Sequence, residues 1–529
     1  MDGGVKQEEM ADQLKREVKE KAHRRSEKFS VPLQEPSRDL ASPISDLLRA
    51  TNVQSSPMSL DASALWLQNG PDIHSSQDAG KAFGQSDAVL FVFYFDTLFP
   101  FLYPFYRPSL LQGGRAWILE MMNRPVVRQA ALCQSAYFFS LALGTADIVW
   151  DKVLTQTRDA FEVLKQALQV LDGLRIEEHL YCAVRIMASV MQLQRFEIAV
   201  LSFDNWQAHL NGALALFRQL LDSSGAVEPA CPRSRFNAVI SRLGPSSWIF
   251  PTEPVQIPSA EQAAFRFSST LVIFDDIIAS TALQEKPKLY EYHCSLLSDS
   301  DGSGSGWTEP PINVEAVIGI KNWVLLQIGE IATLDAWKRH RRAAGNLDVM
   351  ELARRAMIIK DSLVTNLMQL ETEIDPAIAP KDSANLLDIF AQCNCQPSKT
   401  STIQRSLVTH IWAHAALIYL FVVVSGWQPT SVDVRYHVDR IVELLKQLSQ
   451  PALLRTMVWP FCVAGCVAEP MQEAQLRGMT EALQPSAFGT VHKAFKIMEN
   501  VWHNRNVGDI ATRDLATCFR SQGDLVLLV

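Results

Sequence analysis

Two adjacent acidic residues, Asp275 and Asp276, lie in the apolar segment Phe274–Ile278, where they could hold a divalent cation. Carboxylates on one face of a helix bind Mg²⁺, which in turn neutralises a diphosphate leaving group. That chemistry needs a further acid three or four residues later, but Ala279 and Ser280 stand there. A partner motif of the form Asn/Asp-x-x-Ser/Thr-x-x-x-Glu is also missing from the downstream sequence. We therefore expect this acidic pair to belong to the core.

Two histidines and two cysteine pairs have spacings that occur in metal sites. His410 and His414 stand one helical turn apart, but the Glu of a His-Glu-x-x-His motif is missing and the neighbouring residues are apolar. Neither cysteine pair has a second pair at the spacing of a structural zinc site. The pairs are Cys393 with Cys395, and Cys462 with Cys466. We expect core packing for all six residues, and we predict no metal site, no catalytic site and no cofactor.

Apolar residues recur at spacings of three and four over most of the sequence after residue 87. The clearest stretches run through 154–171, 180–191, 206–220 and 434–448. This period puts one apolar stripe of each helix against a neighbour, and no sustained alternation of apolar and polar residues supports a sheet. The predicted fold class is therefore all-α, with a large helical domain over 87–529.

Two segments interrupt the predicted domain. The segment near 222–260 is rich in Pro, Ser and Arg, and the segment near 298–311 contains the run Gly302–Gly306 of alternating Gly and Ser. The run lacks the Lys-Ser/Thr of a phosphate-binding loop. We predict both segments to be flexible insertions.

The N-terminal residues differ in character from the domain. Residues 1–30 are rich in charged residues and predict a short helix with a thin apolar stripe through Met10, Leu14 and Val18. Residues 31–86 contain ten Ser and five Pro and predict a flexible linker. A basic cluster in the charged helix is either a nuclear import signal, a contact to DNA phosphates or a solvated helix face. Its residues are Lys19, Lys21, Arg24 and Arg25.

Bulk composition excludes several classes of protein. The net charge is −8, so the chain has no overall positive field to attract nucleic acid or an anionic membrane. The stretch Ala88–Tyr106 contains Asp96 and two prolines, and the apolar run Ile411–Val424 is too short to span a bilayer, so we expect no membrane segment. The N-terminus has no secretory pattern, and the nine scattered cysteines are best interpreted as reduced thiols of an intracellular protein.

Several blocks of sequence resemble the fungal-specific transcription factor domain of zinc-cluster regulators, of the type found in acriflavine sensitivity control protein. The first and most specific block is Phe93–Pro108, and it continues through Gly113–Leu119 and Ala131–Phe139. Further blocks are Leu271–Leu283, where the acidic pair lies, Leu454–Ala468 around Trp459, and the C-terminal residues Ile497–Trp502 and Val526–Val529. The resemblance spans 87–529 in separated blocks.

The resemblance implies a nuclear transcriptional regulator whose helical domain serves regulation and interaction, often of a secondary-metabolite gene cluster. Members of the family carry a six-cysteine cluster that holds two zinc ions and presents a short helix to DNA. This sequence has no cysteine before Cys133, and residues 1–30 resemble the segment that follows such a cluster. We therefore expect DNA contact only indirectly, or through an N-terminal module missing from this sequence.

Two alternatives remain open from the sequence. One is a cofactor deficient in DNA binding, which acts as a homodimer or as a heterodimer with an intact zinc-cluster partner. The other is a helical enzyme of the terpene synthase type, which would use Asp275 and Asp276 to bind Mg²⁺. We expect no enzyme, because the rest of the Mg²⁺ motif is missing.

Overall fold

The computed structural model describes most of the chain after residue 84. The described residues are 85–108, 114–143, 146–172, 179–200, 206–223, 231–244, 258–298, 310–372, 399–483, 489–505, 513–520 and 525–529. Throughout these ranges helices are the only regular secondary structure, which confirms the predicted all-α class. The charged helix of 1–30, the linker of 31–86, the basic cluster and the Cys393–Cys395 pair lie outside the described residues.

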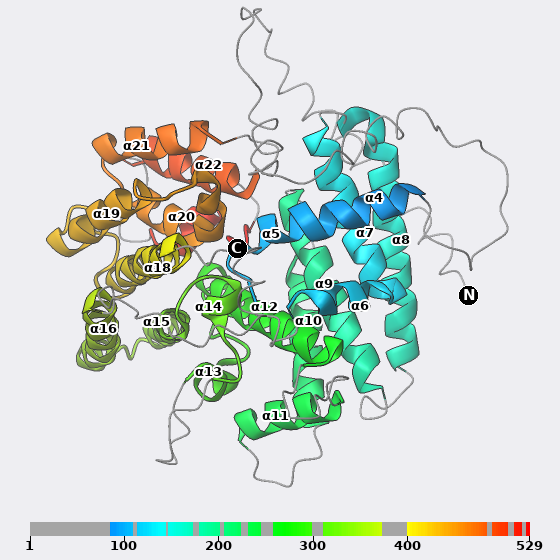
Figure 1. Cartoon of the computed structure of the whole chain (residues 1–529). Coiled ribbons are helices and arrows are strands. Elements are labelled where there is room, and N and C mark those ends of the chain that lie inside the picture. Colours follow the sequence, from blue (N-terminus) through cyan, green and yellow to red (C-terminus); the bar gives the residue numbers. More distant parts are fainter. Residues whose placement is uncertain are drawn as a thin grey trace, which may run out of the picture. The chain divides into compact units, whose positions relative to one another are not determined.

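The first group of helices is built from long amphipathic segments that pack side by side (Figure 1). Helix α7 contacts both α8 and α9, and α9 in turn contacts α10 and α12. Before them α4, η1 and α5 follow one another without a break, with η1 a π-helical turn. The bounds are α4 Gln85–Phe93, η1 Tyr94–Leu98, α5 Phe99–Leu102, α6 Ala116–Met122, α7 Pro125–Ala142, α8 Ala146–Asp172, α9 Leu180–Ala199 and α10 Trp206–Asp222.

Helix α12 (Ala260–Leu283) forms the centre of the domain. It contacts α6, α9, α10, α14, α15 and α23, and nearly every one of its residues is buried. A capping box between Ser259 and Gln262 begins the helix, since each side chain satisfies a backbone N–H of the other residue. It ends at Gln284, whose φ of 58° and ψ of 40° place a left-handed residue where glycine is usual.

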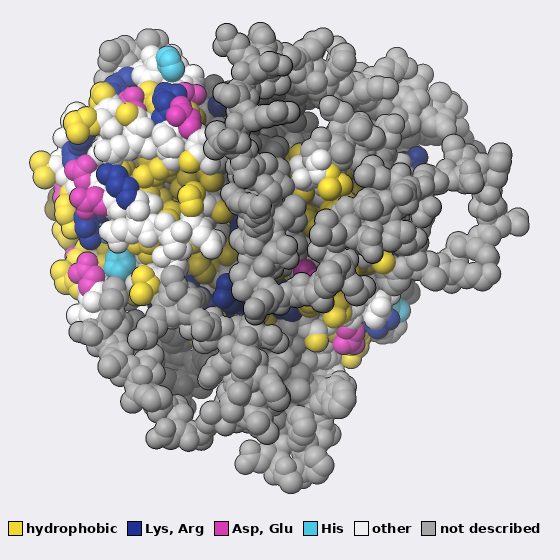
Figure 2. Space-filling view, turned by 45° about the horizontal axis from the view of Figure 1, so that its top comes forward, with side chains coloured by type: hydrophobic (Ala, Val, Ile, Leu, Met, Phe, Trp, Pro, Cys, Tyr) yellow, Lys and Arg dark blue, Asp and Glu magenta, His cyan; other side chains and the backbone are white. Residues whose placement is uncertain are grey.

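A second group of helices continues from α12 to the end of the chain. Helix α15 packs on α12 and on α18, and α18 packs on α19 and α20. The remaining bounds are α13 Tyr290–Leu297, α14 Val314–Val317, α15 Asn322–Ala343, α16 Val349–Thr372, α18 Lys399–Ser425, α19 Val432–Leu445, η3 Pro451–Met457, α20 Val458–Cys466, α21 Pro470–Glu481, α22 Gly489–His503 and α23 Leu515–Phe519, with η3 a 3₁₀ helix. Over the helices at left in Figure 1, apolar side chains gather on one face with charged side chains along its left edge (Figure 2).

The predicted insertion near 222–260 contains a helix, so the prediction of a flexible segment was wrong for that part. Helix α11 (Pro232–Arg242) begins at a proline in the first turn, where the missing N–H costs nothing. It contacts α10 and α13, and its Phe236 is fully buried and stacks on Phe265 at a centroid distance of 4.9 Å. The predicted insertion near 298–311 lies mostly outside the described residues.

Helix α18 is the only described helix long and apolar enough to cross a bilayer. The span Thr402–Ser425 has a mean hydropathy of 2.0, and 89% of its most apolar window is buried inside the protein. Burial against α15, α16 and α19 accounts for that composition, as predicted for a core segment, although the apolar helix is longer than the expected run.

Candidate functional site

Five of the sequence blocks that resemble one family come together around a cavity of about 120 Å³. We call it the Arg455 cavity. Its wall is built from the end of α5 and the residues after it, from α7, α9, α12, the end of α14, η3 and the start of α22, and from Val529. Its lining includes Phe101, Tyr103, Phe138, Arg195, Ala199, Phe274, Arg455, Thr456, Thr490 and Val529. Segments up to several hundred residues apart in sequence therefore share one site.

Two prolines shape the wall formed by the first block. Pro100 cannot donate a hydrogen bond to the preceding turn, and the π-helical turn η1 immediately before α5 gives its ring room. Pro104 disfavours the helical conformation at Tyr103, which has φ −127° and ψ 68° and ends α5. The chain therefore leaves the helix at the edge of the cavity, and Pro104 lines it.

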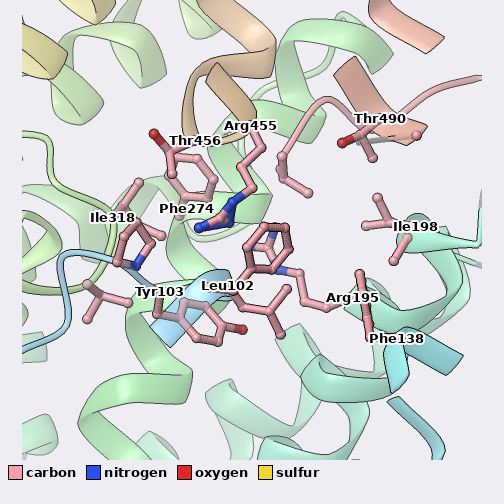
Figure 3. A pocket seen from close by; sticks show the side chains of 16 residues that line it. Leu102, Tyr103, Phe138, Arg195, Ile198, Phe274, Ile318, Arg455, Thr456 and Thr490 are labelled. Carbon is pink, nitrogen blue, oxygen red and sulfur yellow. The ribbon is translucent and has the colours of Figure 1, made fainter. Parts of the chain in front are cut away.

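Arg455 projects into the middle of the cavity from the short 3₁₀ helix η3 (Figure 3). Leu453, Leu454 and Met457 of the same helix are buried, and they fix η3 against the core. The Arg455 guanidinium lies over the Phe101 ring at 3.9 Å from its centroid. That cation–π contact is its main stabilising interaction.

The charge of Arg455 has no counter-ion in the part of the chain that the structure describes. Its Nε is buried without a hydrogen-bond partner, and no carboxylate lies within ion-pair distance of the guanidinium among the described residues. Burial lowers the pKa of Arg455 to about 9, so the group is still a cation at neutral pH. A buried cation without a partner is costly, which makes Arg455 the unusual feature of the site.

The other arginine of the cavity, Arg195 of α9, is already paired. Its Nη2 lies 2.5 Å from Oδ1 of Asp275 on α12, and Gln194 Nε2 donates to the second carboxylate oxygen at 3.2 Å. Burial raises the pKa of the Asp275 carboxyl to about 6, against the opposing effect of Arg195. One positive charge, on Arg455, is therefore left over in the cavity.

The rest of the lining is aromatic and aliphatic with a few hydroxyl groups. In Figure 3 Tyr103 lies below the guanidinium, while Phe274, Thr456 and Thr490 lie in the upper part of the view. Burial raises the pKa of the Tyr103 phenol to about 12, so it stays a neutral hydroxyl. The arrangement can bind an anion and shield it from water, but it offers no acid–base pair for catalysis.

The acidic pair examined as a Mg²⁺ site is used inside the fold. Asp275 holds Arg195, and Asp276 accepts hydrogen bonds from the backbone N–H groups of Lys288 (3.0 Å) and Leu289 (2.8 Å). Asp276 thereby fixes the turn before α13, and neither aspartate is among the residues that line the cavities of the described part of the chain. The expectation of a core segment is confirmed for Phe274–Ile278, all of which is buried.

The histidines and the second cysteine pair also lie in the core. His414 and His410 of α18 are 6% exposed, and His414 Nδ1 lies 2.9 Å from Nδ1 of His437 on α19. Cys462 and Cys466 are buried free thiols. No group of three or more metal-binding side chains occurs within the described ranges.

Sequence reasoning missed Arg455, although the residue lies inside a block that carried the resemblance. The signal present in the sequence is that Arg455 is the single charged residue between Leu453 and Ala468. A lone arginine in an apolar run either lies at the surface at a helix end or is buried, where it can form part of a functional site. Periodicity alone could not decide between these, because it does not locate the aromatic residues of α5 and α12 beside η3.

A second cavity of about 460 Å³ lies between α12, α15, α18 and α23. It is lined by the basic residues Lys338, Arg339, Arg342 and Arg513 and by the acidic residues Asp335 and Asp514. Some of its polar groups are linked by hydrogen bonds: Gln284 receives one from Arg339 and donates one to Asp514 at 2.8 Å. Burial raises the pKa of Asp335 to about 6. Its basic residues outnumber its acidic ones, and they differ from Arg455 in having polar partners, such as the carbonyl of Val423 for Lys338 and Gln284 for Arg339.

Comparison with known proteins gives one family match over nearly the whole described domain. The model for the fungal specific transcription factor domain matches residues 89–528. No solved structure matches the chain.

Curated relatives match over most of the chain. Transcription factor dibT of Pestalotiopsis microspora is 35% identical over 450 residues, which cover 82% of this chain and 70% of the relative. Pestheic acid cluster transcriptional regulator 3 of Pestalotiopsis fici is 24% identical, with 96% of this chain and 88% of the relative covered. Trichothecene biosynthesis transcription regulator TRI10 of Trichoderma arundinaceum is 25% identical, with 80% of this chain and 92% of the relative covered.

Proposed function

Since the chain belongs to the fungal specific transcription factor domain family, we propose that it controls the transcription of a secondary-metabolite biosynthetic gene cluster. It is a transcription regulator and not an enzyme of the terpene synthase type. The names of two relatives indicate which genes such a regulator controls. One is named as a regulator of the pestheic acid cluster and the other as a regulator of trichothecene biosynthesis. The observation that carries the proposal is a match over residues 89–528, which is the whole helical domain.

The site of action is the nucleus. A transcription regulator has a nuclear role in general, and the basic cluster of residues 19–25 is the feature of this sequence that suits recognition by the import machinery. The cluster comprises Lys19, Lys21, Arg24 and Arg25.

DNA is reached through a zinc cluster that the 529 residues do not themselves contain, since none of the residues before Cys133 is a cysteine. The cluster is supplied by a zinc-cluster transcription factor in a heterodimer, or by a module outside these residues, which a homodimer would also need. The TRI10 match supports the first route, because 92% of that named regulator is the part that resembles this chain. A regulator can thus consist of little beyond such a domain.

Deletion of the gene, followed by measurement of transcripts across its chromosomal neighbourhood, tests the proposal. We expect transcripts of adjacent biosynthetic genes to change at least severalfold and to recover when the gene is restored at another locus. Transcripts of a housekeeping gene serve as the control. Unchanged transcripts of every biosynthetic cluster in the genome would contradict the proposed function.

A further inference from the structure

We propose that the Arg455 cavity binds a small organic carboxylate, a monoanion whose apolar body is about the size of one ring, and that this ligand regulates the transcription factor. Its carboxylate would pair with the Arg455 guanidinium, and its body would lie among the rings of Phe101, Phe274 and Phe138. The argument for binding depends only on the cavity, whereas the regulatory role of the ligand rests on the proposed function.

Charge selects a monoanion. Arg195 is neutralised by Asp275 at 2.5 Å, so the cavity carries one unmatched positive charge. Val529 also lines the cavity, and no ion pair of Arg455 occurs among the described residues. A guanidinium binds a planar carboxylate through two parallel N–H···O bonds. A dianion such as a phosphate monoester would leave one negative charge buried without a partner, which is costly.

Size and lining select the body of the ligand. A cavity of about 120 Å³ is close to the ~150 Å³ of an engineered apolar cavity that takes up benzene. The lining is mainly aromatic and aliphatic, and the hydroxyl groups of Tyr103, Thr456 and Thr490 are its main further polar side-chain atoms. Ligand sites commonly combine such an apolar lining with a few polar groups that fix orientation.

The position of the cavity gives the ligand a means of regulation. Its wall takes in α5, α7, α9 and α12 from the first part of the domain, and η3, α22 and Val529 from the last part. An occupant would therefore favour the arrangement in which these segments are closed around it. A ligand that binds one arrangement better shifts the population toward it and raises the stability of the folded state by mass action.

Binding to the purified full-length chain is the direct test. Benzoate, cyclohexanecarboxylate and hexanoate are titrated by calorimetry at pH 7, each beside its own primary amide, which has the same shape without the charge. We expect at least one acid to bind ten or more times more tightly than its amide and to raise the unfolding temperature. The proposal is overturned if none of the three acids binds, or if the amides bind as tightly as the acids.

Two variants separate the guanidinium from the space around it. Arg455→Met keeps the length of the side chain, and we expect at least a tenfold loss of acid affinity with no loss of stability in the absence of ligand, since an unpaired buried cation is removed. Ala199→Leu fills the cavity and leaves Arg455 in place, so binding should again be lost. Retention of acid affinity in either folded variant would overturn the proposal.

Expression in cells distinguishes this inference from the proposed function. A strain that carries Arg455→Met should keep a constant level of the target transcripts when the binding acid is supplied, whereas the wild type should respond. If gene deletion leaves transcripts unchanged but the acid binds through Arg455, the proposed function fails and the site stands. If deletion alters transcripts but no acid binds, the site fails and the proposed function stands.

Discussion

The buried histidine pair His414–His437 joins α18 to α19 through one N–H···N hydrogen bond of 2.9 Å. Such a bond needs at least one neutral ring, because two protonated imidazoles have no acceptor. Burial, reinforced by the neighbouring His437, lowers the pKa of His414 to about 3, and burial lowers the pKa of His437 to about 4. Both rings are therefore neutral in the folded protein over the physiological pH range.

This pair predicts a loss of stability in mild acid. In the unfolded chain both histidines take up protons below about pH 6.5, so their stabilising contribution is complete above that pH and is lost as the pH falls toward 4. The slope for two histidines approaches about 2.7 kcal/mol per pH unit. Denaturant unfolding from pH 7 to pH 4.5 measures it, and the double variant His414→Gln/His437→Gln should show a clearly shallower slope than the wild type. Equal slopes would show that the two rings do not titrate in this way.

Phe461 lies in the sequence block around Trp459, and its substitution tests how much this block contributes to the core. The side chain is fully buried in α20, and truncation of a buried Phe to Ala costs about 3–5 kcal/mol through lost transfer energy and the cavity left behind. The variant Phe461→Ala should show that loss in chemical denaturation. Met471→Ala is the matched control, because Met471 is 79% exposed and its loss should change stability by less than about 0.5 kcal/mol.

At the level of elements, the turn between α14 and α15 depends on Gly319. Its φ is +91°, and a Cβ added there would collide with the Phe105 ring. Both the left-handed backbone and the absence of space exclude a side chain, so Gly319→Ala should destabilise by about 2–4 kcal/mol. In Gly478→Ala of α21 the new methyl meets nothing within 4 Å, and the variant should gain about 0.5–1 kcal/mol from helix propensity. Thermal unfolding of the two variants should therefore shift in opposite directions.

Helix positions could be predicted from the sequence wherever one stripe is apolar. The periodic stretch 206–220 corresponds to α10 (Trp206–Asp222), and the stretch 434–448 corresponds largely to α19 (Val432–Leu445). Helix α11 was missed because its exposed positions carry Arg and Ser, so its short sequence resembles a polar loop, while its burial rests mainly on Phe236, Val239 and Ile240. The composition of the whole segment 222–260 indicated a loop, whereas α11 is stabilised by its packing against other helices.

At the scale of the molecule, the basic cluster makes a prediction about import. Replacement of its four cations by Ala should reduce the nuclear fraction of a fluorescently tagged protein, because import receptors recognise clustered positive charge. The cluster is Lys19, Lys21, Arg24 and Arg25. A tagged wild type that stays outside nuclei at every growth stage would contradict nuclear residence.

The import experiment needs a control with the same change of charge. Four exposed cations elsewhere on the helical domain provide it, and their replacement by Ala should leave the distribution unchanged. They are Lys165, Arg341, Arg342 and Lys446. If both sets reduce import equally, total charge and not the cluster determines entry.

The purified chain should bind DNA only weakly by itself. Sequence readout needs side chains held rigidly against base edges, and the 529 residues offer a short basic segment on a protein of net charge −8. Phosphate contacts of that kind give dissociation constants of roughly 10⁻⁴ to 10⁻⁶ M, weakening further with salt. Titration with promoter fragments at physiological salt measures this. Nanomolar, sequence-selective binding without a partner would contradict it.

The Arg455 cavity could not be predicted from the sequence, and the reason is physical. Tyr103, Phe274 and Arg455 are far apart in sequence, and each has an ordinary core environment in its own segment. What makes a site of them is the unpaired charge in a small apolar space, and this depends on the packing of η3 against α5 and α12. Patterns in one segment carry no information on that packing.

Arg520 and residues 525–528 pack against the centre of the domain, and this constrains how the domain forms during synthesis. Trp206 Nε1 donates to Leu525 O at 2.9 Å, Arg520 donates to the carbonyl of Ala282 at 3.2 Å, and Val526, Leu527 and Leu528 are buried. During translation α10 and α12 emerge long before these partners, so the nascent polypeptide must wait on the ribosome with apolar surface uncovered. Loss of residues 520–529 should therefore leave apolar surface of α10 and α12 uncovered and destabilise the domain.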